Sequence, residues 1–325
     1  MMATVLQVKD LSVTYQNKNR SVQAVKNVSF SIYEGDSLGI VGESGSGKST
    51  LAMAILKLLP KGSAKVTGEC WFEGKELLSI DEATLRELRW KDLSVVFQKA
   101  MNALSPVHRI STQIEDIYRV HEPKATKQEI KDRAMELFKM VGLPERVYAL
   151  YPHEMSGGML QRVAIAISLL HSPKLLIFDE ATTALDVVTQ GQILEEIVRL
   201  EKALHTTRIM ITHDMSVVSA SCTKTAVMYA GQMMEIGKTA DVLKHPMHPY
   251  TQGLLRSFPA LKGERKELES IPGSLPDLSV EHPGCMFESR CPYADERCRS
   301  KQPAGTQMED GRIVACWRYG GESHA

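Results

Sequence analysis

The stretch Gly42-Glu43-Ser44-Gly45-Ser46-Gly47-Lys48-Ser49-Thr50 decides the fold of this 325-residue chain. It follows the apolar run 38–41 and precedes the segment 51–58, which predicts a buried strand, a glycine-rich turn and a helix. Glycines let the backbone curl so that successive N–H groups and the helix N-terminus face an anion. The spacing GxxxxGKS/T in this context predicts that all nine residues bind nucleotide phosphates, with Lys48 at the β and γ phosphates and Ser49 on Mg²⁺. The bland alternative is a glycine-rich turn with a chance lysine.

A second candidate site follows another apolar run, Leu175-Leu176-Ile177-Phe178-Asp179-Glu180. Because carboxyl ends of parallel strands share one edge of a sheet, we expect both acids to lie beside the phosphate loop. Asp179 would complete the Mg²⁺ shell, and Glu180 would polarise a water for attack on the γ-phosphate. The alternative is a solvated strand end.

Alternating strand and helix signals predict an α/β fold with a parallel sheet wrapped by helices. Val5, Val8 and Leu11 begin an N-terminal strand pattern, and the short apolar form of 38–41 recurs at 174–178 and 208–211. Residues 108–171 have a helical pattern. Within that insert, Thr126 and Glu129 predict a capping box, and Gly142 ends the helix.

The tail differs in composition, since eight of the 14 prolines and four of the six cysteines lie beyond residue 244. Proline disfavours helix interiors, so we expect a loop-rich tail. Cys70 and Cys222 lie among apolar neighbours and are expected in the core.

Composition narrows the class of protein. The 39 Lys and Arg balance the 39 Asp and Glu, so the chain has no overall field to attract nucleic acid. Apolar residues make up 43% of the chain, enough to bury a core, yet no apolar run approaches the roughly 18 residues of a membrane span. The first ten residues lack an export signal, so we expect a cytoplasmic protein.

The segment Met155-Ser156-Gly157-Gly158-Met159-Leu160-Gln161-Arg162 resembles the signature sequence of ATP-binding cassette (ABC) proteins. The resemblance implies a P-loop NTPase domain with an N-terminal antiparallel β subdomain and a helical subdomain over about 100–171. It also implies a dimer with ATP between subunits, in which Ser156, Gly157, Gly158 and Gln161 contact the ATP of the partner. A serine and two glycines at a helix N-terminus suit a second phosphate cradle.

Other family positions match in order along residues 1–240. The resemblance places Tyr15 on adenine, Gln98 on Mg²⁺ and the γ-phosphate, and His213 as the switch histidine, catalytic with Glu180 and Lys48. It assigns Ala184-Leu185-Asp186 to the dimer-contact loop. Two departures are Ala181, where proline is common, and Lys99-Ala100, where Asp-Pro is more usual. The second lies in the segment that contacts the membrane subunit in transporters of the family.

The segments His245-Pro246-Met247-His248-Pro249-Tyr250-Thr251 and Gly253-Leu254-Leu255, with the tail, resemble ATPase subunits of bacterial oligopeptide, dipeptide and nickel importers. We therefore expect a nucleotide-binding domain over 1–244 and a family-specific C-terminal extension over 245–325.

Four cysteines, Cys285, Cys291, Cys298 and Cys316, are separated by five, six and seventeen residues. In a reducing cytoplasm they are better interpreted as thiolate ligands than as disulfides. Structural zinc sites usually contain shorter spacings, whereas four thiolates suit a 4Fe–4S cluster, which the resemblance also implies. Zinc and unligated thiols remain alternatives, and the expected role is structural.

The leading hypothesis is an ATP-hydrolysing subunit that powers import of di- or oligopeptides from the cytoplasmic face of the membrane. It would act with a second, paralogous ATPase, two permeases and an extracellular binding protein, and without nucleic acid. Alternatives are an importer of oligosaccharides or nickel, an ABC ATPase acting on DNA or ribosomes, and a scaffold that binds ATP without turnover.

Overall fold

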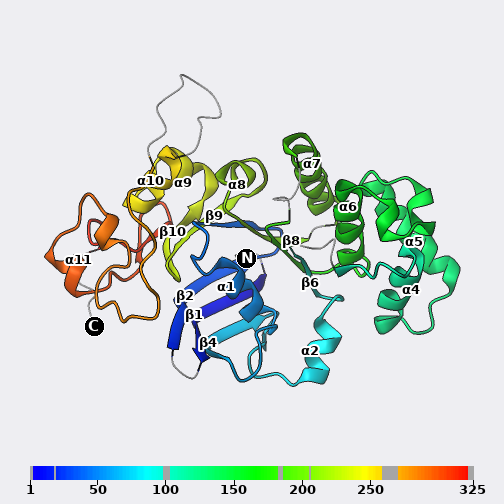
Figure 1. The fold of residues 1–325 in the computed structure, drawn as a ribbon, viewed down its shortest axis with the longest axis horizontal. Coiled ribbons are helices and arrows are strands. Elements are labelled where there is room, and N and C mark those ends of the chain that lie inside the picture. Colours follow the sequence, from blue (N-terminus) through cyan, green and yellow to red (C-terminus); the bar gives the residue numbers. More distant parts are fainter. Residues whose placement is uncertain are drawn as a thin grey trace. The chain divides into compact units, whose positions relative to one another are not determined.

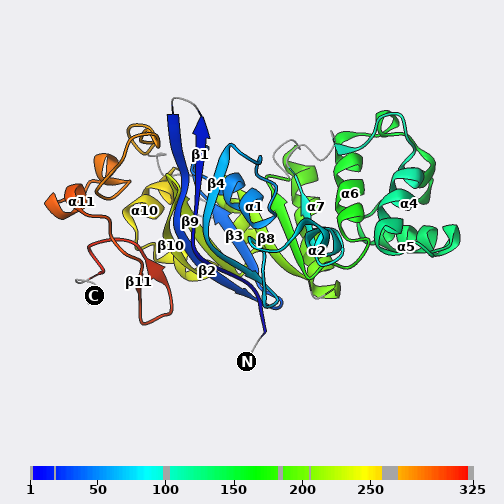
Figure 2. The ribbon, with the colours of Figure 1, turned by 90° about the horizontal axis from the view of Figure 1, so that it is seen from below.

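The computed structural model describes residues 3–17, 20–97, 103–181, 186–204, 206–257 and 270–320. The chain divides into two compact units (Figures 1 and 2). Unit 1 comprises Met1–Val5, Tyr33–Gly35 and Ile80–Ile209, and unit 2 comprises Leu6–Ile32, Asp36–Ser79 and Met210–Ala325. In the described part of the chain, no helix is both long and apolar enough to cross a membrane.

Unit 1 contains a sheet edge and the helical insert. In it β8, β7 and β6 follow one another in the strand order, and β6 is parallel to β7. The insert packs through contacts of α4 with α5 and of α5 with α6, which lie together in green in both views (Figures 1 and 2). The elements are α2 (Glu82–Leu88), β6 (Leu93–Val96), α4 (Ile110–His121), α5 (Lys127–Met140), η1 (Glu145–Ala149), η2 (Pro152–Glu154), α6 (Gly157–Ser168), β7 (Leu175–Asp179), α7 (Val187–Leu204) and the first half of β8 (Thr207–Thr212).

Local sequence explains these elements. Every residue of β7 and β8 is buried, as expected of strands covered on both faces. The predicted capping box of α5 is confirmed, because the Thr126 hydroxyl accepts from the Glu129 N–H while the Glu129 carboxylate accepts from the Thr126 N–H. Gly142 follows with φ +66°, a conformation in which glycine ends helices at little cost.

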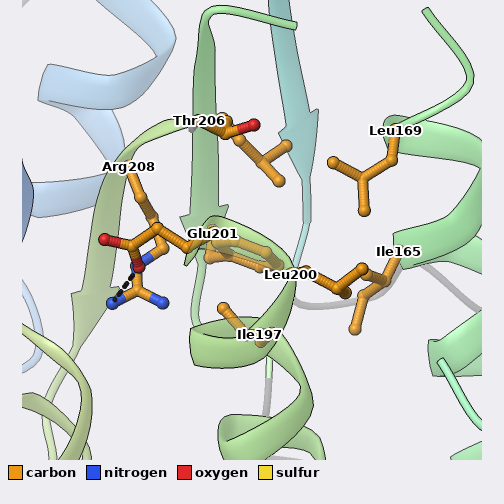
Figure 3. Close-up of a pocket in the computed structure, with 9 residues that line it drawn as sticks. Ile165, Leu169, Ile197, Leu200, Glu201, Thr206 and Arg208 are labelled. Atoms are coloured by element: carbon orange, nitrogen blue, oxygen red, sulfur yellow. Dashed lines mark ion pairs between the residues drawn. The ribbon is translucent and has the colours of Figure 1, made fainter. Parts of the chain in front are cut away.

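A small cavity of about 20 Å³ lies between β7, α6 and α7 in unit 1 (Figure 3). Ile165 and Leu169 of α6 and Ile197 of α7 form part of its apolar wall. At its polar end the buried Arg208 guanidinium pairs with Glu201 at 3.1 Å. The space suffices for about one water molecule, so we regard it as a packing feature.

Unit 2 contains two sheets. The strands β2, β1, β4 and β5 form one sheet, in which β4 runs antiparallel to β1 and β5, so the predicted antiparallel subdomain is confirmed. In the other, β11, β12, β10, β9 and β3 are successive neighbours, and β3 runs parallel to β9. The elements are β1 (Thr4–Asn17), β2 (Arg20–Tyr33), β3 (Ser37–Val41), α1 (Lys48–Ile55), β4 (Ala64–Phe72), β5 (Lys75–Glu76), α8 (Met215–Ser221), β9 (Lys224–Tyr229), β10 (Gln232–Lys238), α9 (Thr239–Lys244), α10 (Pro249–Arg256), η3 (Glu288–Arg290), α11 (Glu296–Ser300), β11 (Thr306–Gln307) and β12 (Ile313–Val314).

The C-terminal extension is built into unit 2 rather than appended to it. Its strand β12 pairs with β10, and the buried carboxylate of Glu235 on β10 binds Arg312 at 3.4 Å and the His248 N–H at 2.9 Å. Burial raises the pKa of Glu235, and these polar contacts oppose that shift. The boundary expected at 244/245 thus falls inside one compact unit and stays a prediction.

Four aromatic side chains join the extension to the core of unit 2. The Phe287 ring packs edge-on against Tyr229 at 5.3 Å and Tyr250 at 5.4 Å between centroids, and lies 6.0 Å from His248. All four residues are almost fully buried. Aromatic pairs in such tilted arrangements add to the burial of apolar area. Cys70 and Cys222 are also buried, as expected.

Candidate nucleotide site and cysteine cluster

The phosphate loop has the predicted strand, turn and helix context. It runs from the end of β3 into α1, and Gly47 is the N-cap of α1 with φ +97°. Gly42 approaches β9 so closely that a Cβ there would collide with the carbonyl oxygen of Met228. The first turn of α1 contains no acidic residue, so no carboxylate within it opposes an anion at the positive end of the helix dipole.

Lys48 is almost fully buried beneath this loop. Its ammonium donates to the carbonyl oxygens of Gly42 at 2.8 Å and Glu43 at 2.9 Å, and lies 3.3 Å from the Ser46 hydroxyl. Ser49, the expected Mg²⁺ ligand, is exposed. Such an arrangement concentrates N–H donors and one cation where a polyphosphate can bind.

Tyr15 lies next to the loop, as expected of an adenine-stacking residue. It is a half-buried residue of β1, and its hydroxyl is 3.4 Å from that of Thr50 at the start of α1. The structure therefore brings Tyr15 together with the phosphate loop inside unit 2.

The two acids stand at the end of β7 in unit 1. Asp179 is the last residue of the strand and is buried, whereas Glu180 has the unusual φ of +49° and is half-buried. Such a backbone conformation is uncommon outside glycine and is found at functional turns. Ala181, which replaces the common proline, is buried.

The signature segment forms the N-terminus of α6. Ser156 is exposed and caps the helix, because its hydroxyl accepts from the Met159 N–H at 3.3 Å. Gly158 packs against Thr189 of α7, where a Cβ would lie 3.0 Å from the threonine methyl. Gln161 is buried, so its side chain contributes to the interior of unit 1. The expected contacts with a partner's ATP stay a prediction for these residues.

The structure also places Asp186, expected in the dimer-contact loop, and His213, the expected switch histidine. Asp186 is exposed and caps α7, accepting from the hydroxyl and N–H of Thr189 at 2.6 and 3.0 Å, which lowers its pKa. His213 follows β8 and is exposed. Other expected residues lie outside the described ranges: Gln98, Lys99, Ala100, Ala184 and Leu185.

The four tail cysteines line one cavity of unit 2, together with His248. Local bonds set their positions, since the Cys285 N–H donates to the Cys298 carbonyl at 2.7 Å and Asp295 caps the short helix of Cys298. All six cysteines of the chain are free thiols. Within the described residues, no three His, Cys, Asp or Glu side chains form a group that could hold a metal ion.

The cysteine thiols favour the protonated state in the protein alone. The pKa of Cys285 is raised to about 12, mainly by burial and in part by the neighbouring thiolates, while a backbone hydrogen bond opposes the shift. Burial is also the largest cause of the raised pKa of the remaining three, Cys291, Cys298 and Cys316. A multiply charged cation in the cavity would reverse this preference.

Comparison with known proteins decides the family. The family described as "ABC transporter" matches residues 25–183, and "Oligopeptide/dipeptide transporter, C-terminal region" matches residues 234–298. A probable peptide ABC transporter ATP-binding protein of Sinorhizobium fredii is 43% identical over 97% of this chain and 95% of its own length. The chain belongs to the ABC transporter ATP-binding protein family.

Further ABC relatives agree in length as well as in sequence. The oligopeptide transport ATP-binding protein OppD of Escherichia coli is 43% identical over 97% of this chain and 93% of its own. The ATP-binding cassette MJ0796, in a dimeric post-hydrolysis state bound to ADP and Pi, matches with a TM-score of 0.64 at 30% identity. This match covers 72% of our chain and 98% of the cassette. The predicted ABC fold class is therefore confirmed, and ATP hydrolysis coupled to transport is the activity of this family.

Sequence reasoning missed three residues around the loop: Tyr229, Tyr250 and Arg290. The Tyr250 hydroxyl accepts from the Glu43 N–H at 3.0 Å, and Arg290 pairs with the Glu43 carboxylate at 3.0 Å. The His245–Thr251 segment did signal that Tyr250 belongs to a family-specific element, but its partner in space could not be deduced.

Proposed function

We propose that the chain is the ATP-hydrolysing subunit of a bacterial importer of di- or oligopeptides. The observation that carries the proposal is the phosphate loop, with Lys48 held beneath it and Tyr15 beside it, in a chain that matches peptide-importer ATPases along almost its whole length. Oligosaccharide or nickel import is the alternative for the same machinery, since the ATPase subunit does not contact the cargo.

The proposed roles follow the chemistry of phosphoryl transfer, which demands positioning and charge neutralisation. Lys48 and N–H groups within residues 42–50, other than that of Glu43, bind the β and γ phosphates. Ser49, Gln98 and Asp179 hold Mg²⁺, and Tyr15 stacks on adenine. Glu180 polarises the attacking water, and His213 interacts with the γ-phosphate. ATP binding closes the two cassettes against each other, and hydrolysis reopens them.

The decisive test of the catalytic assignment is Glu180→Gln in the assembled transporter. ATP turnover should fall by about a hundredfold or more, as expected when a positioned general base is removed. ATP affinity should be retained because the substituted side chain does not bind the phosphates. Unchanged turnover would refute the role of Glu180.

We also propose that the chain pairs with a second, paralogous ATPase and binds two permeases on the cytoplasmic face of the membrane. The exposed Ser156 at the N-terminus of α6 supports contact with a partner's ATP. The dimeric state of the cassette MJ0796 provides a precedent. Co-purification of one or two kinds of ATPase with the permeases distinguishes a heterodimer from a homodimer.

For the extension we propose a 4Fe–4S cluster held by Cys285, Cys291, Cys298 and Cys316. The four thiols line one cavity without forming a group that could hold a single metal ion, and a cluster differs from a single ion because each thiolate binds a different iron. Thiols whose pKa is raised also need a strong local positive charge to ionise. The bound cluster would supply four iron–thiolate bonds that pin a tail with little apolar core. Anaerobic purification should give iron and absorbance in the visible range, and a colourless, iron-free protein would contradict this assignment.

The cargo is best identified on the cognate binding protein. Thermal-shift panels of peptides, oligosaccharides and divalent metals should stabilise it selectively with peptides. Stabilisation by an oligosaccharide or by nickel instead would select the alternative.

A further inference from the structure

Arg290 of the C-terminal extension reaches the phosphate loop. Its Nη1 lies 3.0 Å from Oε2 of Glu43, the second residue of the loop, and its side chain is only 5% exposed. An ion pair so shielded from solvent is less screened than a surface pair and holds its partners in a defined geometry.

The rest of the guanidinium is fixed by the extension and the core. Nε donates to the Pro272 carbonyl at 2.7 Å, Nη2 to the Ile271 carbonyl at 3.2 Å, and Nη1 to the Tyr229 hydroxyl at 3.2 Å. Burial opposes the charge, but the hydrogen bonds to Glu43 and Tyr229 outweigh it and raise the pKa of Arg290. Arg290 is therefore a permanent cation in a fixed orientation.

Glu43 is bound through its main chain as well. Its N–H donates to the Tyr250 hydroxyl at 3.0 Å, and its carbonyl accepts from Lys48 at 2.9 Å. A Cβ on Gly45 would lie 3.4 Å from Leu275, so the extension also touches the loop two residues further on. The extension, including α10, thus contacts the first half of the loop at Glu43 and next to Gly45.

We infer that Arg290 and Tyr250 are positioning residues for ATP binding, which act through Glu43 to hold the phosphate loop in its binding conformation. A loop that is already ordered loses less conformational entropy when a ligand binds, so its affinity is higher. The inference rests on the proposed role of residues 42–50 in binding phosphates. It adds that the C-terminal extension sets the affinity for ATP.

The test uses the full chain in the assembled transporter and measures KM and kcat for ATP, with ATP dissociation constants from calorimetry. Arg290→Met should raise KM and the dissociation constant about tenfold while kcat changes less than twofold. Arg290→Lys should restore part of the affinity. Adding Glu43→Gln to Arg290→Met should cause no further loss, because both remove the same contact.

Arg299→Met is the matched control, since Arg299 forms an exposed ion pair with Glu288 in the same extension. It should leave KM unchanged. An equal rise of KM in Arg299→Met, additive effects in the double variant, or unchanged KM in Arg290→Met would each overturn the inference. If Arg290→Met does not fold, the Glu43→Gln variant alone provides the test. An ATP dissociation constant that is unchanged in Glu43→Gln would overturn the inference. A wild-type complex that binds ATP without turnover would refute the proposed function, while the dissociation constants would still test Arg290.

Discussion

Truncating Phe287 to alanine tests whether the extension belongs to the core of unit 2. The ring is 2% exposed and meets Tyr229 and Tyr250 edge-on at 5.3 and 5.4 Å. Phe→Ala changes at fully buried sites cost about 3–5 kcal/mol, and the two ring contacts place this one near the middle of that range. We expect a loss of about 4 kcal/mol from the free energy of unfolding, a large part of the roughly 5–15 kcal/mol typical of a domain.

Urea unfolding of the full chain, followed by circular dichroism, measures this loss. The midpoint of unfolding should move to a lower urea concentration. The dependence of the unfolding free energy on urea concentration should stay constant, because the same surface is exposed on unfolding. The control is Val280→Ala, a change at a side chain in the extension that is 58% exposed, which should alter stability by less than about 0.5 kcal/mol. A loss below about 1 kcal/mol for Phe287→Ala would show that the extension folds separately from unit 2.

Three further changes have defined outcomes. Gly42→Ala should abolish ATP binding in calorimetry, since its Cβ collides with a backbone carbonyl, whereas Gly74→Ala, with φ +77° and open space around it, should bind ATP normally and cost only about 1 kcal/mol. Glu201→Ala removes a partner of the buried Arg208 and should lower the free energy of unfolding by about 2–4 kcal/mol, measured by urea titration. Burial and the nearby His121 lower the pKa of His171, so the unfolded chain takes up a proton more readily below its ordinary pKa of about 6.5. Stability should therefore fall as the pH drops below that value, and the fall should be smaller in His171→Phe, measured as melting temperature at pH 7.5 and 5.5.

Local signals in the sequence predicted the elements that position the site. The GxxxxGKS/T spacing, the apolar run before Asp179 and the Thr126 cap each depend on neighbours within about one helical turn or one strand. Such patterns determine backbone conformation directly, so the phosphate loop, β7 and α5 occur where they were expected. The position of Ser156 at a helix N-terminus was predictable for the same reason.

Contacts between residues far apart in the sequence could not be predicted, because no local sequence pattern indicates them. Arg290 pairs with Glu43 across 247 positions, and neither residue lies in a periodic pattern that identifies its partner. Gln161 illustrates the converse, because a motif fixed its place on α6 but not that its side chain would be buried. Asp186 has a local capping role that the resemblance did not reveal. Side-chain direction in these cases depends on tertiary packing, which single-sequence patterns do not encode.

The separation of Glu43 from Arg290 has a consequence for synthesis of the protein. A ribosome completes the phosphate loop first, and the two residues that hold Glu43, Tyr250 and Arg290, follow 207 and 247 positions later. At about 5–20 residues per second, those 247 positions correspond to a delay of at least about ten seconds. During that interval the nascent cassette has its loop sequence without the contacts that order it, and ribosome-bound chains stalled before and after residue 290 should differ in their capacity to retain ATP.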